Sequence, residues 1–237
     1  MVNKPRARKK TSHSRAYLSA GVVAVLLIAG TGYLYVSGTY PFARGESTTT
    51  ASCSPLTLPV TYTTLSSSNP VYAHFNTSLG SFEAELFPAS APKTVSNFVS
   101  LADSGFYDNL VWHRIEPKFV IQVGDPTTRC GLGDRSTWGQ RGSNVTVPLE
   151  IDKSLHNYEG YLGMARSTDN NSGSSQFYVN LGNNTASLDG RYTVFGEVTG
   201  GISVVQALGS VPVQTYGNQN EPVNPVYIYS INITSVP

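Results

Sequence analysis

Arg114 is the first residue whose type and position suggest chemistry. It lies beside His113 in the stretch VWHRIEPKFVIQVGD (111–125), where apolar and polar residues alternate as in a β-strand. An arginine is rarely buried unless a partner satisfies its charge, so Arg114 taken alone favours a structural ion pair. Its permanent charge and rigid fork of donors equally suit it to bind a substrate.

Other chemistries find little support in the sequence. The four histidines, His13, His74, His113 and His156, have no metal-ligand spacing with cysteines or acidic residues. No G-x-S-x-G sequence is present, and the Gly-rich segment 131–142 lacks a phosphate-binding pattern. We therefore expect no metal and no cofactor, and we interpret His113 as buried scaffold rather than a base.

Short strands and two helices are expected to position these residues. Residues 71–87 alternate around a turn at 78–80, which predicts a hairpin, and an apolar helical face between Pro92 and Gly105 predicts a helix. Further along, the pattern predicts one or two strands around 116–118, a long surface loop over 126–147, strands around 161–165, 176–181 and 192–198, a short helix over 200–210, and a closing strand over 226–234. These elements indicate a mainly β domain, either a closed barrel capped by helices or a sandwich.

Three segments, APKTVSNFVSLADSGFYDNLVWHRIEPKFVIQVGD, LGMARSTDNNSGSSQFYVNL and LDGRYTVFGEV, follow one another in this order. Together they resemble the cyclophilin family of peptidyl-prolyl cis–trans isomerases, over about residues 71–236. The resemblance implies a closed eight-stranded antiparallel β-barrel capped by two α-helices, and isomerase activity on X-Pro bonds without a cofactor.

The resemblance also implies which residues form the site. Arg114 matches the catalytic arginine, Phe119 the aromatic floor of a proline pocket, and Gln122 a glutamine that contacts the substrate backbone. The further positions that it assigns to substrate binding are Val120, Ala165, Arg166, Gln176, Tyr178, Leu188 and Tyr192. Several of them depart from the family's usual residues: Val120 replaces a methionine, Arg166 an asparagine, Tyr178 a phenylalanine, and Tyr192 the histidine of many eukaryotic members. None of these changes removes the arginine, so we expect catalysis.

The chemistry explains the residue types. Rotation about a peptide bond costs about 18–20 kcal/mol, and a catalyst needs only to bind the twisted amide more tightly than either planar form. Twisting returns a lone pair to the proline nitrogen, to which the Arg114 guanidinium could donate a hydrogen bond. An apolar pocket of Phe119, Tyr178 and Leu188 would hold the proline ring.

The N-terminal part predicts a membrane anchor. Residues 1–15 are basic and residues 16–36 carry no charge, which is long enough to cross a bilayer of about 30 Å. We expect a transmembrane signal anchor at 16–37, a Ser/Thr/Pro-rich linker at 38–70, and the catalytic domain, residues 71–237, outside the cytoplasm. Secretion after signal cleavage is the alternative. No basic patch accompanies the folded part, so no nucleic-acid partner is expected.

Two cysteines, Cys53 and Cys130, lie on the predicted outer side. A disulfide between them and two unpaired thiols both remain open, because their separation in space cannot be read from sequence.

Three functions are considered for the chain, which we expect to be a monomer. The first is a prolyl isomerase that assists the folding of extracytoplasmic proteins and takes proline-containing polypeptides as substrates. The second is a non-catalytic module, tethered to the membrane, that binds such segments as a chaperone. A third, weaker interpretation is a scaffold within a membrane complex.

Overall fold

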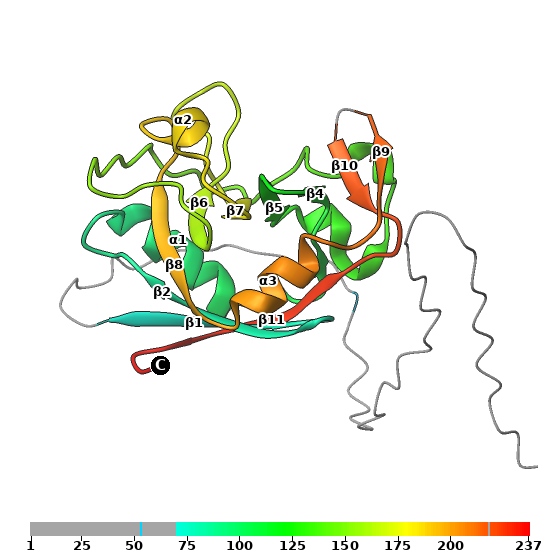
Figure 1. The fold of residues 1–237 in the computed structure, drawn as a ribbon, viewed down its shortest axis with the longest axis horizontal. Helices are drawn as coiled ribbons and strands as arrows, with labels where there is room; N and C mark the ends of the chain where they lie inside the picture. The colour runs from blue at the N-terminus through cyan, green and yellow to red at the C-terminus, as the bar shows by residue number, and fades with distance from the viewer. Residues whose placement is uncertain (1–52, 54–69, 218) are drawn as a thin grey trace, which may run out of the picture. The chain divides into compact units, whose positions relative to one another are not determined.

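A computed structural model describes Cys53, residues 70–217 and residues 219–237. These residues form a nine-stranded sheet, a two-stranded sheet, three α-helices and two 3-10 helices (Figure 1). The strands are β1 (Val71–Thr77), β2 (Gly80–Leu86), β3 (Leu110–Val111), β4 (Arg114–Glu116), β5 (Val120–Val123), β6 (Tyr161–Met164), β7 (Phe177–Asn180), β8 (Val194–Gly200), β9 (Val213–Tyr216), β10 (Gln219–Pro222) and β11 (Tyr227–Thr234). The helices are α1 (Pro92–Asp103), η1 (Pro126–Gly131), η2 (Arg135–Thr137), α2 (Thr185–Leu188) and α3 (Ile202–Leu208).

The large sheet is antiparallel and has the order β3-β11-β1-β2-β8-β6-β7-β5-β4. Its edge strands β3 and β4 are separated by only two residues, Trp112 and His113, so the sheet must curl until its two edges approach. No hydrogen-bonded ladder joins β3 to β4 in the described part of the chain. The mainly β prediction is confirmed, but the structure has an open curled sheet of nine strands in place of a closed barrel of eight. The chain runs from β3 through Trp112 and His113 into β4, and these two strands are the opposite edges of the sheet rather than hydrogen-bonded neighbours.

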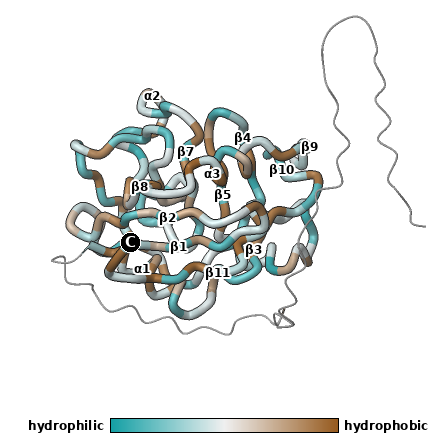
Figure 2. The backbone as a smooth tube through the Cα atoms, turned by 60° about the horizontal axis from the view of Figure 1, so that its bottom comes forward, coloured by the Kyte–Doolittle hydropathy of each residue, from teal (hydrophilic) through white to brown (hydrophobic). Residues whose placement is uncertain are grey.

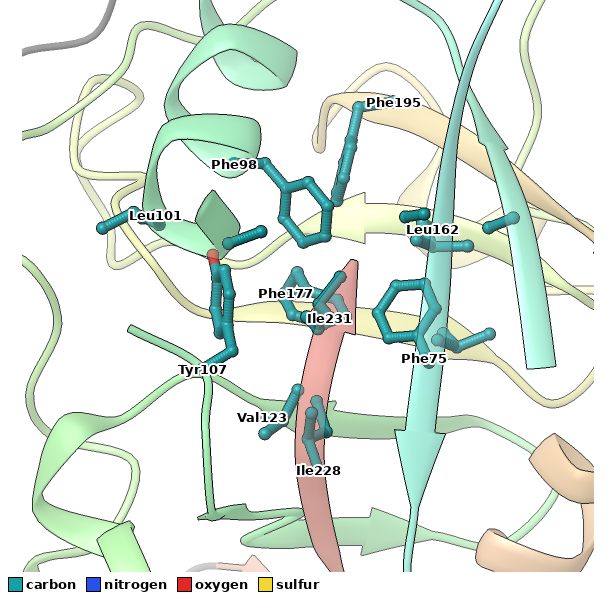
Figure 3. Packing of buried hydrophobic residues seen from close by; sticks show 14 of the residues in the cluster. Phe75, Phe98, Leu101, Tyr107, Val123, Leu162, Phe177, Phe195, Ile228 and Ile231 are labelled. Carbon is teal, nitrogen blue, oxygen red and sulfur yellow. The ribbon is translucent and has the colours of Figure 1, made fainter. Parts of the chain in front are cut away.

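An aromatic core fills the space between the curled sheet and α1 (Figure 3). Phe98 of α1 lies with its ring centroid 5.3 Å from that of Phe177 on β7 and 5.3 Å from that of Phe195 on β8. Phe75 on β1 stacks on Phe82 on β2 at 4.3 Å. Phe75 and Phe82 are buried because β1 and β2 alternate inward and outward residues, as the sequence predicts.

Helix α1 begins at Pro92, as predicted, since proline suits the first turn where a backbone N–H would be unsatisfied. Its N-terminus is capped by a distant residue. The Glu150 carboxylate accepts hydrogen bonds from the backbone N–H groups of Lys93 (3.1 Å) and Thr94 (2.8 Å). A carboxylate at this end is also favoured by the helix dipole. The helix therefore depends on a residue more than fifty positions away.

The segment predicted as a surface loop, 126–147, is more structured than expected. It contains η1 and η2, and Arg129 within η1 is buried. The Arg129 guanidinium donates to the backbone oxygens of Asp108 (2.5 Å) and Phe106 (2.7 Å), which satisfy two of its nitrogens. The Asp125 carboxylate holds the segment's start, because Oδ1 accepts from the N–H of Thr127 and Oδ2 from the N–H of Arg141.

The small β9–β10 sheet was not predicted, and it packs against β4. Asn220 on β10 donates its side-chain N–H to Glu116 on β4 at 2.7 Å. Arg135 pairs with the buried Glu221 at 3.0 Å and lies 4.9 Å over the ring of Trp138. These contacts attach the hairpin beside the strand that carries Arg114.

A disulfide joins Cys53 to Cys130 across a sequence separation of 77 residues. Cross-linking residues so far apart restricts the unfolded chain, and disulfides contribute about 2–4 kcal/mol on this account. We expect Cys53→Ser to lower the free energy of unfolding by about that amount, measured by urea unfolding of the oxidised proteins. Reduction of the wild type should give the same loss, and adding reductant to Cys53→Ser should change nothing further. An unchanged unfolding midpoint after reduction would contradict this prediction.

The predicted anchor at 16–37 and nearly all of the predicted linker at 38–70 lie outside the described residues. Within the residues that are described, no helix is long and apolar enough to span a bilayer. Along the residues that the structure describes, hydrophobic and hydrophilic residues follow one another at short intervals (Figure 2).

Candidate active site

Arg114 and Gln122 face each other across the β4–β5 pair. The two residues are register partners, and Arg114 Nη1 donates to Gln122 Oε1 at 3.3 Å. Arg114 Nε lies 3.4 Å from Glu116 Oε1, and the guanidinium carbon lies 5.9 Å from the centroid of the Phe119 ring. The Arg114 side chain is 28% exposed. It is therefore held in place by protein groups yet open to a ligand.

A second glutamine orients Gln122. The Gln122 amide nitrogen donates to Gln176 Oε1 at 2.8 Å, and the Gln176 nitrogen donates to the backbone oxygens of Gly139 (2.9 Å) and Arg141 (2.6 Å). Because the Gln122 nitrogen is already used, its oxygen points to Arg114. The structure thus brings Arg114, Gln122 and Gln176 together in one hydrogen-bonded row.

An apolar cluster adjoins this row. Val120, Tyr178 and Leu188 are buried together, and the partly exposed residues that pack against them are Phe119, Ala165 and Tyr192. The rings of Tyr178 and Tyr192 meet edge to face at 5.9 Å. All six come from the predicted set, and Phe119 links the cluster to the Arg114 guanidinium.

The hydroxyl of Tyr178 finds the partner that a buried phenol needs. It donates to Asn157 Oδ1 at 2.8 Å, and Asn157 in turn donates from Nδ2 to Asp189 Oδ1 at 2.9 Å. Burial raises the pKa of Tyr178 well above its usual range, so the hydroxyl stays a neutral donor. The Tyr178 ring lies against Gly163 on β6, where a Cβ atom would come 2.1 Å from the ring carbon Cζ.

Arg166 completes the predicted set, at the outer side of the cluster. Its guanidinium carbon lies 4.9 Å from the centroid of the Tyr192 ring. Its hydrogen bonds go to three backbone oxygens, from Nε to Arg191 (2.9 Å) and from Nη1 to Ser167 (2.8 Å) and Thr168 (3.4 Å). The side chain is fixed without a carboxylate partner in the described part of the chain.

Two residues that contact the site were missed by the sequence analysis. Glu116 lies two positions after Arg114 on the same strand, so a period of two would have placed both side chains on one face. Asn157 carries no such signal, because it comes from a loop 21 residues before Tyr178 and reaches it only in the folded protein.

His113 is fully buried, as the sequence predicts. Burial lowers the pKa of His113 from 6.5 to about 4, although the nearby Asp125 carboxylate opposes the shift. Because the folded state disfavours the imidazolium, the unfolded state binds more protons below pH 6.5. The free energy of unfolding is therefore not reduced by His113 above pH 6.5. It decreases as the pH falls from 6.5 towards 4, because the unfolded state then takes up a proton that the folded state does not.

As the pH is lowered below 6.5, we expect His113 to reduce the free energy of unfolding by about 1.4 kcal/mol per pH unit. Urea unfolding of the wild type and of His113→Gln at pH 7, 6 and 5 measures the effect, and the variant should have the shallower slope. NMR titration of the His113 ring in the wild type provides an independent check. A midpoint near 6.5 in the folded protein would rule the prediction out.

No group of three or more His, Cys, Asp or Glu side chains that could hold a metal ion occurs among the described residues. The site combines two fixed arginines, two glutamines and an apolar cluster.

Comparison with known proteins assigns the chain that carries this site to a family. Residues 72–233 match the family model described as cyclophilin type peptidyl-prolyl cis-trans isomerase/CLD. The chain belongs to the cyclophilin-type peptidyl-prolyl cis-trans isomerase family. A curated relative, peptidyl-prolyl cis-trans isomerase-like 1 of Aspergillus niger, is 42% identical over 67% of this chain and 92% of its own. A peptidyl-prolyl cis-trans isomerase of Acinetobacter baylyi is 35% identical over 68% of this chain and 84% of its own.

A solved structure agrees with this assignment to the cyclophilins. The crystal structure of a Cryptosporidium parvum cyclophilin type peptidyl-prolyl cis-trans isomerase, in the presence of the dipeptide Ala-Pro, superposes with a TM-score of 0.61 at 28% sequence identity. The match covers 69% of this chain and 98% of that one. The cyclophilin fold and enzyme family predicted from the three segments are confirmed.

Proposed function

We propose that this cyclophilin accelerates X-Pro isomerisation at the apolar cluster beside Arg114, and that its substrates are exported polypeptides. The observation that carries the proposal is the position of the Arg114 guanidinium, over Phe119 and bonded to Gln122, with part of its surface open. The Ala-Pro dipeptide with the Cryptosporidium parvum relative supports a proline-containing ligand.

The proline ring would lie on Phe119 and Leu188, against the buried wall formed by Tyr178. Held there, the ring keeps its own side of the amide still, so that rotation moves the N-terminal side. As the amide twists, the proline nitrogen becomes pyramidal and accepts a hydrogen bond from Arg114. That bond exists only in the twisted state, so it lowers the barrier without tightening the ground state. No proton is transferred, and no nucleophile is needed.

Gln122 and Glu116 limit the freedom of the arginine. Gln122 Oε1 accepts from Nη1, and Glu116 lies beside Nε, so the fork is oriented before a substrate arrives. A donor that is oriented in advance needs no reorganisation during the reaction. Gln122 is also placed to bind the substrate backbone next to the rotating bond.

Location outside the cytoplasm is supported by two features. The basic residues at 1–15 followed by the uncharged run at 16–36 fit a single-pass anchor with an outer domain. The Cys53–Cys130 disulfide fits an oxidising compartment. On this proposal a monomeric domain, tethered to the membrane, assists proteins that fold after export.

The test measures isomerisation of a short Xaa-Pro peptide by the purified chain. After a solvent jump, the decay of the cis form is recorded over time. Acceleration proportional to protein concentration supports the isomerase. The alternative is the module that binds proline peptides without turnover. Peptide binding that perturbs Tyr178 and Tyr192 fluorescence, with decay no faster than the uncatalysed rate, would support that module and refute the isomerase.

A further inference from the structure

We infer that Arg166 selects substrates with an acidic side chain close to the proline. This inference rests on the proposed function, because it assigns a substrate class to the same site. Its starting point is a cation at the edge of the apolar cluster that has no acidic partner in the described part of the chain.

The Arg166 guanidinium is fixed rather than mobile. Nε and Nη1 are held by backbone oxygens of Arg191, Ser167 and Thr168, and the plane packs on Tyr192. Its other terminal nitrogen, Nη2, donates to no described residue. A donor group that is already ordered loses little side-chain entropy when a carboxylate binds. The free edge of the guanidinium can therefore accept a carboxylate at small cost.

Two carboxylates, one three residues after Arg166 in the chain and one next to Leu188 of the cluster, are already engaged. Asp169 Oδ1 accepts from the N–H of Asn171 at 2.9 Å. Asp189 accepts from Asn157 at 2.9 Å and lies 2.6 Å from His156 Nδ1. Neither forms an ion pair with Arg166, so its charge is not cancelled by a neighbouring acid.

The cation is within reach of a peptide that occupies the cluster. Arg166 packs on Tyr192, and Tyr192 meets Tyr178 at 5.9 Å. An extended peptide covers this span in about three residues. The Arg166 charge also lowers the pKa of Tyr178, although burial of the phenol and the charges of Tyr192 and Asp189 raise it by more. The field of Arg166 therefore extends to the wall of the cluster.

The other arginine pointing to the site differs in this respect. Arg114 has Glu116 at 3.4 Å, which offsets much of its charge towards a substrate side chain. Arg166 is thus the residue that can discriminate between acidic and basic neighbours of the proline.

The experiment compares peptides that differ by one charge. Glu, Lys or Ala is placed in turn immediately before the proline, one residue further before it, or immediately after it, and kcat/KM is measured at low salt. For at least one position we expect Glu to exceed Lys by about two- to fivefold, the size typical of exposed ion pairs. The ratio should fall towards one at about 1 M salt, where charges are screened beyond about 3 Å.

Variants assign the ratio to Arg166. Arg166→Gln should bring the Glu/Lys ratio to one, and Arg166→Glu should invert it. The matched control is Arg191→Gln, which removes an equal charge from the exposed side chain next to Tyr192 but keeps the backbone oxygen that holds Arg166. This control should keep the ratio.

The inference is overturned if the Glu/Lys ratio is one at all three positions, or if Arg166→Gln leaves it unchanged. The neutral Ala peptide separates this result from the proposed function, since turnover of that peptide does not depend on charge selection. If the Ala peptide is not turned over at all, the isomerase proposal fails. The same ratios are then read from the dissociation constants of the peptides, which test the charge selection alone.

Discussion

Replacing Arg114 with alanine is expected to lower kcat/KM for an Xaa-Pro peptide by about a hundredfold to a thousandfold, the usual effect of removing a donor aimed at the transition state. The guanidinium is expected to act only when the amide is twisted. The loss should therefore be equal in kcat and in kcat/KM. Isomerisation assays over a range of peptide concentrations separate the two quantities.

Two controls accompany the Arg114 variant. Arg114→Lys keeps the charge but loses the planar fork, so we expect it to recover little of the lost activity. Thermal unfolding should change little in both variants, because the Arg114–Glu116 ion pair is partly exposed and such pairs add little stability. An Arg114→Ala protein that is folded and retains a third or more of the wild-type kcat/KM would remove Arg114 from the mechanism.

Gly163→Ala is expected to displace the Tyr178 ring and lower kcat/KM by about tenfold to a hundredfold, as small misplacements at a reacting centre do. The added Cβ would lie 2.1 Å from Tyr178 Cζ, far inside any allowed contact. The ring cannot yield in place, because it is buried and its hydroxyl is bonded to Asn157. Overpacking of this kind also costs about 1–3 kcal/mol of stability. Activity assays and urea unfolding measure the two effects.

The matched control is Gly200→Ala on β8. It adds the same methyl group to a strand, but the new Cβ meets only Glu83 Cβ at an ordinary 3.7 Å. This variant should retain wild-type activity. In a Tyr178→Leu background, Gly163→Ala should cost less than it does in the wild type, since the clashing ring is gone. Equal losses in both backgrounds would mean that the clash with Tyr178 is not the cause.

Local patterns predicted the elements whose stability comes from neighbouring residues. The β1–β2 hairpin follows from alternation around a tight turn, and α1 follows from Pro92 and an apolar face that ends before Gly105. Both elements begin within about two residues of the predicted positions.

Elements held by distant contacts could not be predicted in this way. Residues 213–222 contain two strands, yet their sequence is polar and ends in Pro222. The hairpin is attached by Asn220 to Glu116, which is 104 residues away. The sequence after Asp125 predicts a loop, because nothing in it indicates that Arg129 is buried against backbone oxygens.

The candidate site also contains residues that the sequence predicts and residues that it does not. The resemblance of the three segments predicts ten site residues, and the structure places these ten around one cluster and one hydrogen-bonded row. The roles of those residues stay predictions. The residues that support them are the ones missed: Asn157 under Tyr178 and Asn220 behind Glu116 come from other segments and depend on the completed fold.

The order of strands has a consequence for biosynthesis. Among the described residues, β11 is the last strand, and it lies in the sheet between β1, the first, and β3. Until residues 227–234 have been synthesised, β1 lacks one neighbour and β3 has none. Pairing of the two ends of a domain is a high-contact-order event, and such events are slow. We therefore expect this folding catalyst to acquire its own native sheet only after residues 227–234 have left the ribosome.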